Sequence, residues 1–431
     1  MKKILIITYY FPPSGGAGVQ RALKFVKYLP QFGIEPIVLT VDENKASYPL
    51  VDSSLINDIP KEIKIHKTDS FEALNILSKL TSKKNIPYGG FSGQNKEKSS
   101  QKILRFIRGN FFIPDARIGW VKYAYDKASE IIENEKIDTI FISSPPHSSQ
   151  LIGIKLKKNF PHIKWIADLR DPWTDIYYYK DMMHTAWAKR KDERLELKTI
   201  ELADEILVVS DAIKRMLAGK SSNIKDKKIH VIPNGFDEVD FNGIARLDSD
   251  EFLITYVGTI SDVYYPAVFF ESLKKLIENH PEDKIKFRFV GSISPEVSNA
   301  VETYKLKDKC EFISQVSHSK AIEYMVSSTA LLLVIPEVEN NKGILTGKLF
   351  EYLNTRNPII GIGPVDGDAS IIMNDCNAGK MFNRNQSVDL SDYLEALFTA
   401  WKQNHDSILN THNIAKYSRK AQAKELAALI S

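Results

Sequence analysis

A glycine-rich turn separates the first apolar run of the chain, residues 3–10, from a segment with helical periodicity over 17–32. The turn has the sequence SGGAG over 14–18 and follows two prolines. Glycine lets backbone N–H groups approach a ligand closely, and a helix N-terminus adds unpaired N–H groups with a partial positive charge. Gly15 and Gly16 therefore predict a binding site for an anion, most often a phosphate.

Polar and glycine residues also follow the other apolar runs. They include His147, Arg170, Asp171 and Trp173 in the first half of the chain, and Gly258, Thr259 and the segment 336–353 in the second half. Ligands of open parallel sheets bind at the carboxyl ends of the strands. The two sets of residues therefore predict a cleft between two domains.

Short apolar runs alternate with amphipathic segments of helical length, a pattern typical of parallel sheets covered by helices on both faces. The alternation restarts after a seam near 236–251. We predict an α/β protein with two Rossmann-like, doubly wound domains over 1–240 and 241–408. A last helix, within 409–431, is expected to pack back on the first domain. The expected strands are 3–10, 34–40, 137–143, 163–169, 205–210, 228–236, 252–260, 286–293, 310–316, 330–336 and 357–364.

Residues 79–110 interrupt this alternation with a polar segment in which eight lysines and arginines stand against Glu97 alone. The segment is either a solvated insertion or a basic surface that contacts anionic lipid head groups. Each basic residue near such a membrane surface contributes roughly 1 kcal/mol. Nucleic acid is not an expected partner, because the segment lacks regularly interleaved aromatic residues.

The composition is that of an ordinary globular protein, with 43% hydrophobic and 26% charged residues and a net charge of +4 in 431 residues. Cys310 and Cys376 are far apart and outside any C-x-x-C pair, which argues against a disulfide framework or a zinc site. No apolar stretch approaches the roughly 20 residues of a membrane-spanning helix. We expect a cytoplasmic protein without a metal or cofactor, and the oligomeric state stays open.

A nicotinamide dinucleotide is an alternative ligand for the first glycine turn. However, SGGAGVQ does not match G-x-G-x-x-G in register, and Asp42 is only the nearest candidate for the acidic residue that would bind the ribose. The sequence also lacks the G-x-x-x-x-G-K-[ST] motif of P-loop nucleotide hydrolases. An NAD(P)-dependent oxidoreductase is therefore the alternative function from a different class.

Several motifs resemble those of the family-4 glycosyltransferases, which have the GT-B fold of two facing Rossmann-like domains. They are YYFPPSGGAGVQRA, SSPPHSSQLIG, ADLRDPW, IPNGFD, YVGTI and TGKLFEYL, and they occur in the order of the family over nearly the whole chain. The chain most resembles the bacterial subgroup that makes surface polysaccharides and glycolipids. The resemblance implies transfer of a sugar from a nucleotide-sugar donor, a UDP- or GDP-sugar, to a glycan or lipid-linked acceptor.

The resemblance also implies roles for individual residues. Gly15 and Gly16 would direct backbone N–H groups at the donor diphosphate, and Gly258 and Thr259 would follow the first strand of the donor domain. Glu351 matches the second glutamate of the family's E-x7-E motif, whose carboxylate accepts hydrogen bonds from the ribose hydroxyls. Lys348, one helical turn earlier, would face the phosphates.

One position departs from the family pattern. The first glutamate of the motif, which holds the donor sugar in the family, falls at Gly343. The backbone of Gly343, Ile344 and Leu345 could hold the donor sugar instead. Glu337 or Glu339 could also replace the missing carboxylate. The remaining alternative is that sugar transfer is weak. A scaffold that binds sugar nucleotide without transferring it, or an epimerase of the same fold, therefore stays open.

The first domain is expected to bind the acceptor. His147 either contacts the reacting groups or the acceptor, or caps the helix that follows it. Asp171 either acts on a substrate or joins Asp168 and Arg170 in a structural ion pair, because buried carboxylates need such partners. Arg170 and Trp173 are candidate acceptor contacts. By the resemblance, the anomeric configuration is retained, no metal is needed, and the leaving phosphate itself takes the acceptor proton. The reaction would require closure of the domains.

Overall fold

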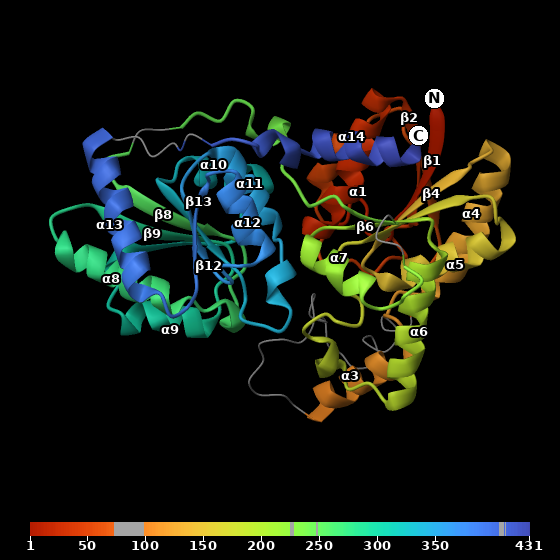
Figure 1. Cartoon of the computed structure of the whole chain (residues 1–431), viewed down its shortest axis with the longest axis horizontal. Coiled ribbons are helices and arrows are strands. Elements are labelled where there is room, and N and C mark those ends of the chain that lie inside the picture. The colour runs from red at the N-terminus through yellow and green to blue at the C-terminus, as the bar shows by residue number, and fades with distance from the viewer. Residues whose placement is uncertain (73–98, 225–227, 247–248, 405–408, 410) are drawn as a thin grey trace. The chain divides into compact units, whose positions relative to one another are not determined.

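The computed structural model describes residues 1–72, 99–224, 228–246, 249–404, 409 and 411–431. It divides into two compact units (Figure 1), one formed by residues 1–233 and 419–431 and the other by 234–418. The first boundary thus lies at 233/234, slightly before the predicted position at 240. Among the described residues, no helix is long and apolar enough to cross a membrane.

The first unit is built on a parallel sheet with the strand order β3-β2-β1-β4-β5-β6-β7 in the described residues. Its helices lie on both faces of this sheet (Figure 1). The strands are β1 (Lys2–Ile7), β2 (Ile34–Val41), β3 (Lys64–Thr68), β4 (Thr139–Ser144), β5 (Lys164–Leu169), β6 (Glu205–Val208) and β7 (Ile229–Val231). The helices are α1 (Ala17–Tyr28), α3 (Ser99–Phe111), α4 (Val121–Glu135), α5 (Gln150–Asn159), α6 (Ala186–Leu202), α7 (Asp211–Ala218) and α14 (Arg419–Ile430).

Alternate side chains of β1 enter two separate cores, because successive residues of a strand point to opposite faces. Leu5 and Ile7 pack into the core under α4 and α5. Ile4 and Ile6 pack into the core under α1 and α14. The last helix therefore completes the first unit, and it lies within the predicted range 409–431.

The second unit repeats this architecture with the strand order β10-β9-β8-β11-β12-β13 in the part that is described. Its strands are β8 (Phe252–Val257), β9 (Ile285–Val290), β10 (Cys310–Ile313), β11 (Ala330–Val334), β12 (Ile359–Ile362) and β13 (Gly379–Phe382). The helices are α8 (Ala267–Asn279), α9 (Pro295–Thr303), α10 (His318–Val326), α11 (Gly347–Thr355), α12 (Asp368–Asp375) and α13 (Ser387–Asn404). One core lies under α8, α9 and α13, and the other under α10, α11 and α12.

The prediction of two doubly wound, Rossmann-like domains is confirmed. Strands β3 and β13 were not predicted. The side chains of β3 are half-buried or exposed, so the strand lacks the continuous apolar run of a central parallel strand. Helix α12 was also not predicted.

Candidate functional site

The glycine turn after β1 leads into α1 with an unusual backbone conformation. Gly16 has φ +92° at the N-cap of α1, and a Cβ there would meet no atom within 4 Å. Its conformation, rather than crowding, thus favours glycine. The Gly15 N–H donates to the Leu50 carbonyl at 2.9 Å. The prediction that the Gly15 N–H binds a ligand is therefore corrected, because this donor already has a partner.

A fully buried ion pair lies beside this turn. The Arg21 guanidinium of α1 donates to both carboxylate oxygens of Asp168 at 2.8–3.1 Å, and both side chains have 0% exposure. Arg21 also donates to the carbonyls of Ile232 and Pro233, and Ser143 donates to Asp168 at 2.7 Å. Asp168 therefore joins α1 to the carboxyl ends of β4 and β5. The predicted ion pair is thus corrected, because the partner of Asp168 is Arg21 and not Arg170.

The Arg170 guanidinium is committed to the backbone. It donates to the carbonyls of Gly18 at 2.6 Å, Ser144 at 3.0 Å and Pro145 at 3.0 Å, and the residue is 8% exposed. These bonds hold the glycine turn against the end of β4. A positioning role therefore replaces the predicted acceptor contact of Arg170.

Asp171 lies outside this network, and its side chain is exposed. Solvent reaches the carboxyl, yet desolvation by the surrounding protein raises its pKa above the usual value, and the Arg170 charge opposes the shift only in part. The carboxylate is therefore not the partner of a structural ion pair. It stays a candidate for contact with a substrate.

His147 and Trp173 form a stacked pair at the same edge of the sheet. Their ring centroids are 4.8 Å apart and their planes differ by 12°. Trp173 is 3% exposed, and its indole N–H donates to Asp192 at 2.8 Å. Asp192 also accepts from the Tyr179 hydroxyl at 2.9 Å, and burial raises its pKa to about 7. Trp173 is thus a buried support for His147, which corrects its prediction as an acceptor contact.

The half-buried His147 imidazole makes no capping hydrogen bond. Its Nδ1 atom is buried and has no partner in the described part of the chain. Desolvation, with a smaller effect from the Arg170 charge, lowers the pKa of His147 to about 3. The capping interpretation is therefore wrong, and the imidazole is a neutral group at the end of β4.

In the second unit, Lys348 lies against the glycine that ends β8. Its ammonium donates to the Tyr256 hydroxyl at 3.1 Å and lies 4.9 Å from the centre of that ring. Gly258 has φ +110°, and a Cβ there would lie 2.4 Å from Lys348 Cε. The backbone conformation therefore favours glycine, and a larger residue would displace the lysine stem. Desolvation lowers the pKa of Lys348 to about 8, and Glu351 opposes this shift.

Lys348 is the second residue of α11, beside an unpartnered hydroxyl. Thr346, the N-cap residue, makes no capping bond, and its buried Oγ1 has no partner among the described residues. A cation at a helix N-terminus is electrostatically unfavourable. The site thus combines a desolvated ammonium, an unpartnered threonine hydroxyl and the positive end of a helix. A bound anion would interact favourably with all three.

Glu351, one turn along α11, is fixed by a residue that sequence reasoning missed. His318 Nε2 lies 2.9 Å from Glu351 Oε1, and His318 Nδ1 lies 4.0 Å from Asp240. His318 is the first residue of α10, after the carboxyl end of β10. Its position after a predicted strand was the sequence feature that could have indicated a place near the site.

The segment that replaces the first glutamate of the motif is largely packed. Gly343 is buried, Leu345 is 8% exposed in the core, and the Ile344 N–H donates to the Asn341 carbonyl at 3.1 Å. Of the substitutes considered, Glu337 is paired with Arg384 at 3.2 Å. Thr259 is exposed, and its carbonyl accepts from the Tyr256 hydroxyl at 2.9 Å.

Two family models match consecutive parts of the chain. The model described as Glycosyltransferase Family 4 matches residues 89–239, and the one described as Glycosyl transferases group 1 matches 240–413. The chain is a family-4 glycosyltransferase of the GT-B fold. No curated protein matches the transferase in sequence.

Solved structures share the fold of this transferase at low identity. Sucrose-phosphate synthase from Thermosynechococcus elongatus is 14% identical with a TM-score of 0.63, covering 100% of this chain and 98% of that one. The lipopolysaccharide outer core galactosyltransferase WaaB is 13% identical with a TM-score of 0.58, covering 99% of each chain. Anabaena HepE, in complex with UDP and glucose, is 10% identical with a TM-score of 0.54. The match covers 100% of this chain and 95% of that one.

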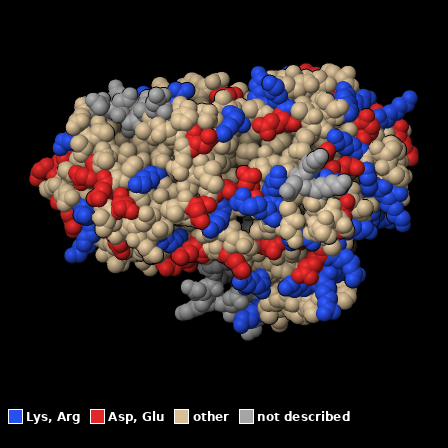
Figure 2. Space-filling view, viewed as in Figure 1, with Lys and Arg blue, Asp and Glu red and all other residues tan. Residues whose placement is uncertain are grey.

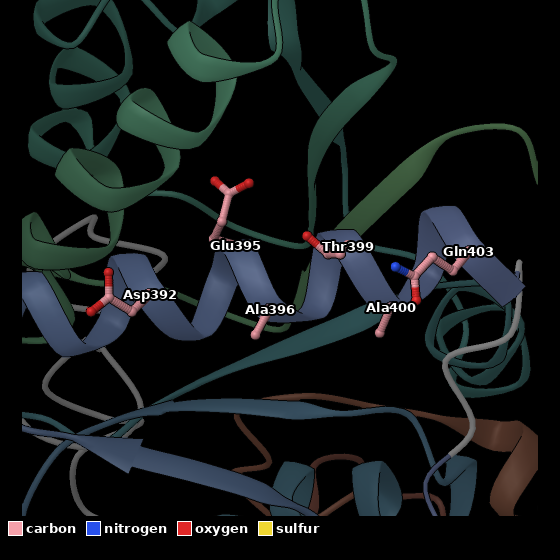
Figure 3. Close-up of a pocket in the computed structure, with 6 residues that line it drawn as sticks. All are labelled: Asp392, Glu395, Ala396, Thr399, Ala400 and Gln403. Carbon is pink, nitrogen blue, oxygen red and sulfur yellow. The ribbon is translucent and has the colours of Figure 1, made fainter.

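A surface hollow of about 580 Å³ on the transferase lies along α13 (Figure 3). One helix contributes its whole lining, and Glu395 there is already bonded to His280. The lining residues are Asp392, Glu395, Ala396, Thr399, Ala400 and Gln403. No group of this stripe suggests substrate chemistry. On the face shown in Figure 2, acidic and basic side chains are interspersed, which gives no extended basic surface for nucleic acid.

We predict that the His147 imidazole of the transferase will not titrate between pH 5 and pH 8. Its folded-state pKa of about 3 lies below the usual 6.5, so the unfolded chain binds more protons below pH 6.5. The contribution of His147 to stability is therefore complete above pH 6.5 and is lost as the pH falls toward 3. NMR titration of 15N-labelled histidines measures this, with His147→Gln assigning the signal. A midpoint near 6.5 would contradict the buried, neutral state.

Proposed function

We propose that this enzyme transfers a sugar from a UDP- or GDP-sugar to a glycan or lipid-linked acceptor. The observation that carries the proposal is the desolvated Lys348 ammonium at the N-terminal end of α11. It forms no ion pair in the described part of the chain, and its hydrogen bond is to the neutral Tyr256 hydroxyl. A diphosphate would supply the missing negative charge and accept from the Thr346 hydroxyl as well.

Glu351 is proposed to bind the ribose of the donor. A carboxylate accepts hydrogen bonds from two neighbouring hydroxyls, which matches a ribose diol. The contact with His318 fixes one carboxylate oxygen, so the carboxylate is held in one orientation. The HepE structure, which contains UDP, supports a uridine nucleotide as the first to test.

The reaction proposed is transfer with retention and without a metal. The bond between the anomeric carbon and the phosphate oxygen breaks, and the acceptor hydroxyl forms the new glycosidic bond. The leaving phosphate takes the acceptor proton, so no protein base is required. Lys348 stabilises the charge that develops on that phosphate. The Gly16 peptide is proposed as a second phosphate contact.

The acceptor is proposed to bind the first unit near His147 and Asp171. A neutral imidazole can accept or donate a hydrogen bond to a sugar hydroxyl. The exposed Asp171 carboxylate can accept one as well. Together they would orient the attacking hydroxyl.

A cytoplasmic location at the inner face of the membrane is part of the proposal. Residues 79–98 of the predicted basic segment lie outside the described residues. The remaining part, α3, exposes Ile103 by 61% and Phe106 by 40%, and Lys102 is exposed beside them. Exposed apolar and basic side chains on one helix are typical of peripheral membrane contact.

The experiment that tests the function is calorimetric binding of UDP, GDP, ADP and NAD(H) without added metal. We expect one nucleoside diphosphate to bind selectively and Glu351→Ala to weaken it about tenfold, since hydrogen bonds to a charged group contribute about 1.5–3 kcal/mol. Glu302→Ala, at an exposed carboxylate of the same unit, is the control.

Binding of NAD(H) alone would overturn the proposal. Binding of a nucleoside diphosphate without turnover of any sugar nucleotide would identify a non-transferring relative. Conversion of the donor sugar without an acceptor would identify an epimerase.

A further inference from the structure

Arg108 is a cation without a counter-ion on the inner side of α3. In the described part of the chain it makes no hydrogen bond or ion pair, and its Nε atom is buried. The residue as a whole is half-buried. A guanidinium carries five N–H donors, so leaving all of them without a protein acceptor is unusual for a partly buried arginine.

The position of Arg108 is fixed by the packing of α3. A Cβ on Gly109 would lie 2.3 Å from the Met182 carbonyl, so the helix touches this backbone closely. Asn110 donates to the Met183 carbonyl at 3.0 Å and accepts from the Thr185 N–H at 2.6 Å. Figure 1 shows α3 beside one end of α6. The helix therefore holds Arg108 in place.

The charged groups around Arg108 do not neutralise it. Desolvation lowers the pKa of Arg108 most, and the charge of Arg117 lowers it further. The Asp115 carboxylate raises it. Asp115 is already used, because it accepts from the Ser148 N–H at 2.7 Å, the Ser148 hydroxyl at 2.8 Å and the Arg117 N–H at 2.8 Å. Arg117 in turn is paired with Glu72 at 3.0 Å.

The electrostatic interaction with Asp115 links Arg108 to the proposed acceptor side of the first unit. Ser148 directly follows His147 in the chain, and both lie at the carboxyl end of β4. Tyr10, which follows β1, and Tyr178 also act electrostatically on Arg108. The unpaired guanidinium thus acts electrostatically with groups that follow the strands at the ligand-binding edge of the sheet.

We propose that Arg108 binds a phosphate group of the acceptor substrate. This inference rests on the proposed function, because it names the chemical class of the acceptor. The planar fork of a guanidinium matches two oxygens of a phosphate. The phosphate belongs either to a soluble sugar phosphate or to a lipid head group.

The test is binding of phosphate-bearing probes to the full chain in two arms. The soluble arm is calorimetry with glucose 6-phosphate and with glucose. The lipid arm is sedimentation with phosphatidylcholine vesicles that contain or lack phosphatidic acid. Both use Arg108→Gln and the control Lys122→Gln, an exposed cation on α4. Lys348→Met in each variant removes the proposed donor phosphate site.

We expect Arg108→Gln to weaken binding of the phosphate probe in one arm about tenfold or more, and Lys122→Gln to leave it unchanged. Arg108→Lys keeps the charge but loses the planar fork. Its affinity for the probe should lie between those of the parent and Arg108→Gln, and it controls for folding. UDP affinity should be unchanged in Arg108→Gln. Equal binding of both probes by the parent and Arg108→Gln would overturn the inference. If Lys348→Met alone loses UDP binding in that experiment, the proposed donor site stands although the inference about Arg108 fails.

Discussion

Lys348→Met is expected to weaken binding of the nucleoside diphosphate by about a hundredfold, which corresponds to about 2.7 kcal/mol. The substitution keeps the length and apolar character of the stem that packs against Gly258 and Tyr256. It removes the charge that we propose to pair with the diphosphate. Charge-assisted bonds in desolvated sites are strong, so the effect should exceed that of Glu351→Ala. Calorimetry measures it directly.

The same lysine predicts a pH dependence of donor binding. Desolvation lowers its pKa to about 8 in the free enzyme, and the protonated form is the one that binds an anion. Affinity should therefore be full below pH 8 and fall as the pH rises through 8, by up to about tenfold per pH unit. Lys348→Met should bind weakly with no such dependence.

Lys342→Met is the matched control, because Lys342 is exposed on the preceding segment and pairs with Asp366. It should bind the nucleotide as the parent does. A parent enzyme whose affinity is constant from pH 7 to pH 10 would contradict the role of the Lys348 ammonium. So would equal affinities of Lys348→Met and Lys342→Met.

Asp168→Ala is expected to lower the free energy of unfolding by about 3–5 kcal/mol, the usual effect of removing one partner of a buried ion pair. Arg21 would keep its charge at 0% exposure without a carboxylate beside it. Urea unfolding, followed by the signals of the first unit, measures the change. The double substitution Arg21→Met with Asp168→Leu should recover much of the loss.

Asp171→Ala is the control for this prediction, since its exposed side chain lies outside the ion pair. It should change stability by less than about 0.5 kcal/mol. An Asp168→Ala variant that unfolds like the parent but loses turnover would contradict the structural role. It would indicate that Asp168 acts on a substrate.

The alternation of apolar runs and amphipathic segments was sufficient to predict the two doubly wound units. Central parallel strands are buried on both faces, so β1, β4, β8 and β11 appear in the sequence as continuous apolar runs. Strand β3 has only half-buried or exposed side chains and β13 is four residues long, so neither gave a comparable signal.

The candidate site was predictable only in part. The sequence pointed to Lys348 and Glu351 through their spacing on one helix and their motif. It gave no indication that His318, 33 residues before Glu351, would contact its carboxylate. It also suggested a binding role for Gly15, whose N–H the structure pairs with Leu50.

The sequence by itself thus determined the element order, the fold class and the places where polar groups follow strands, because these depend on local periodicity. Only the tertiary structure decided which polar groups are free for a ligand. Asp168 is paired with Arg21 across 147 positions, whereas the guanidinium of Arg108 has no such partner in the described residues. Pairing depends on which atoms long-range packing brings together, and residue type and spacing do not specify that.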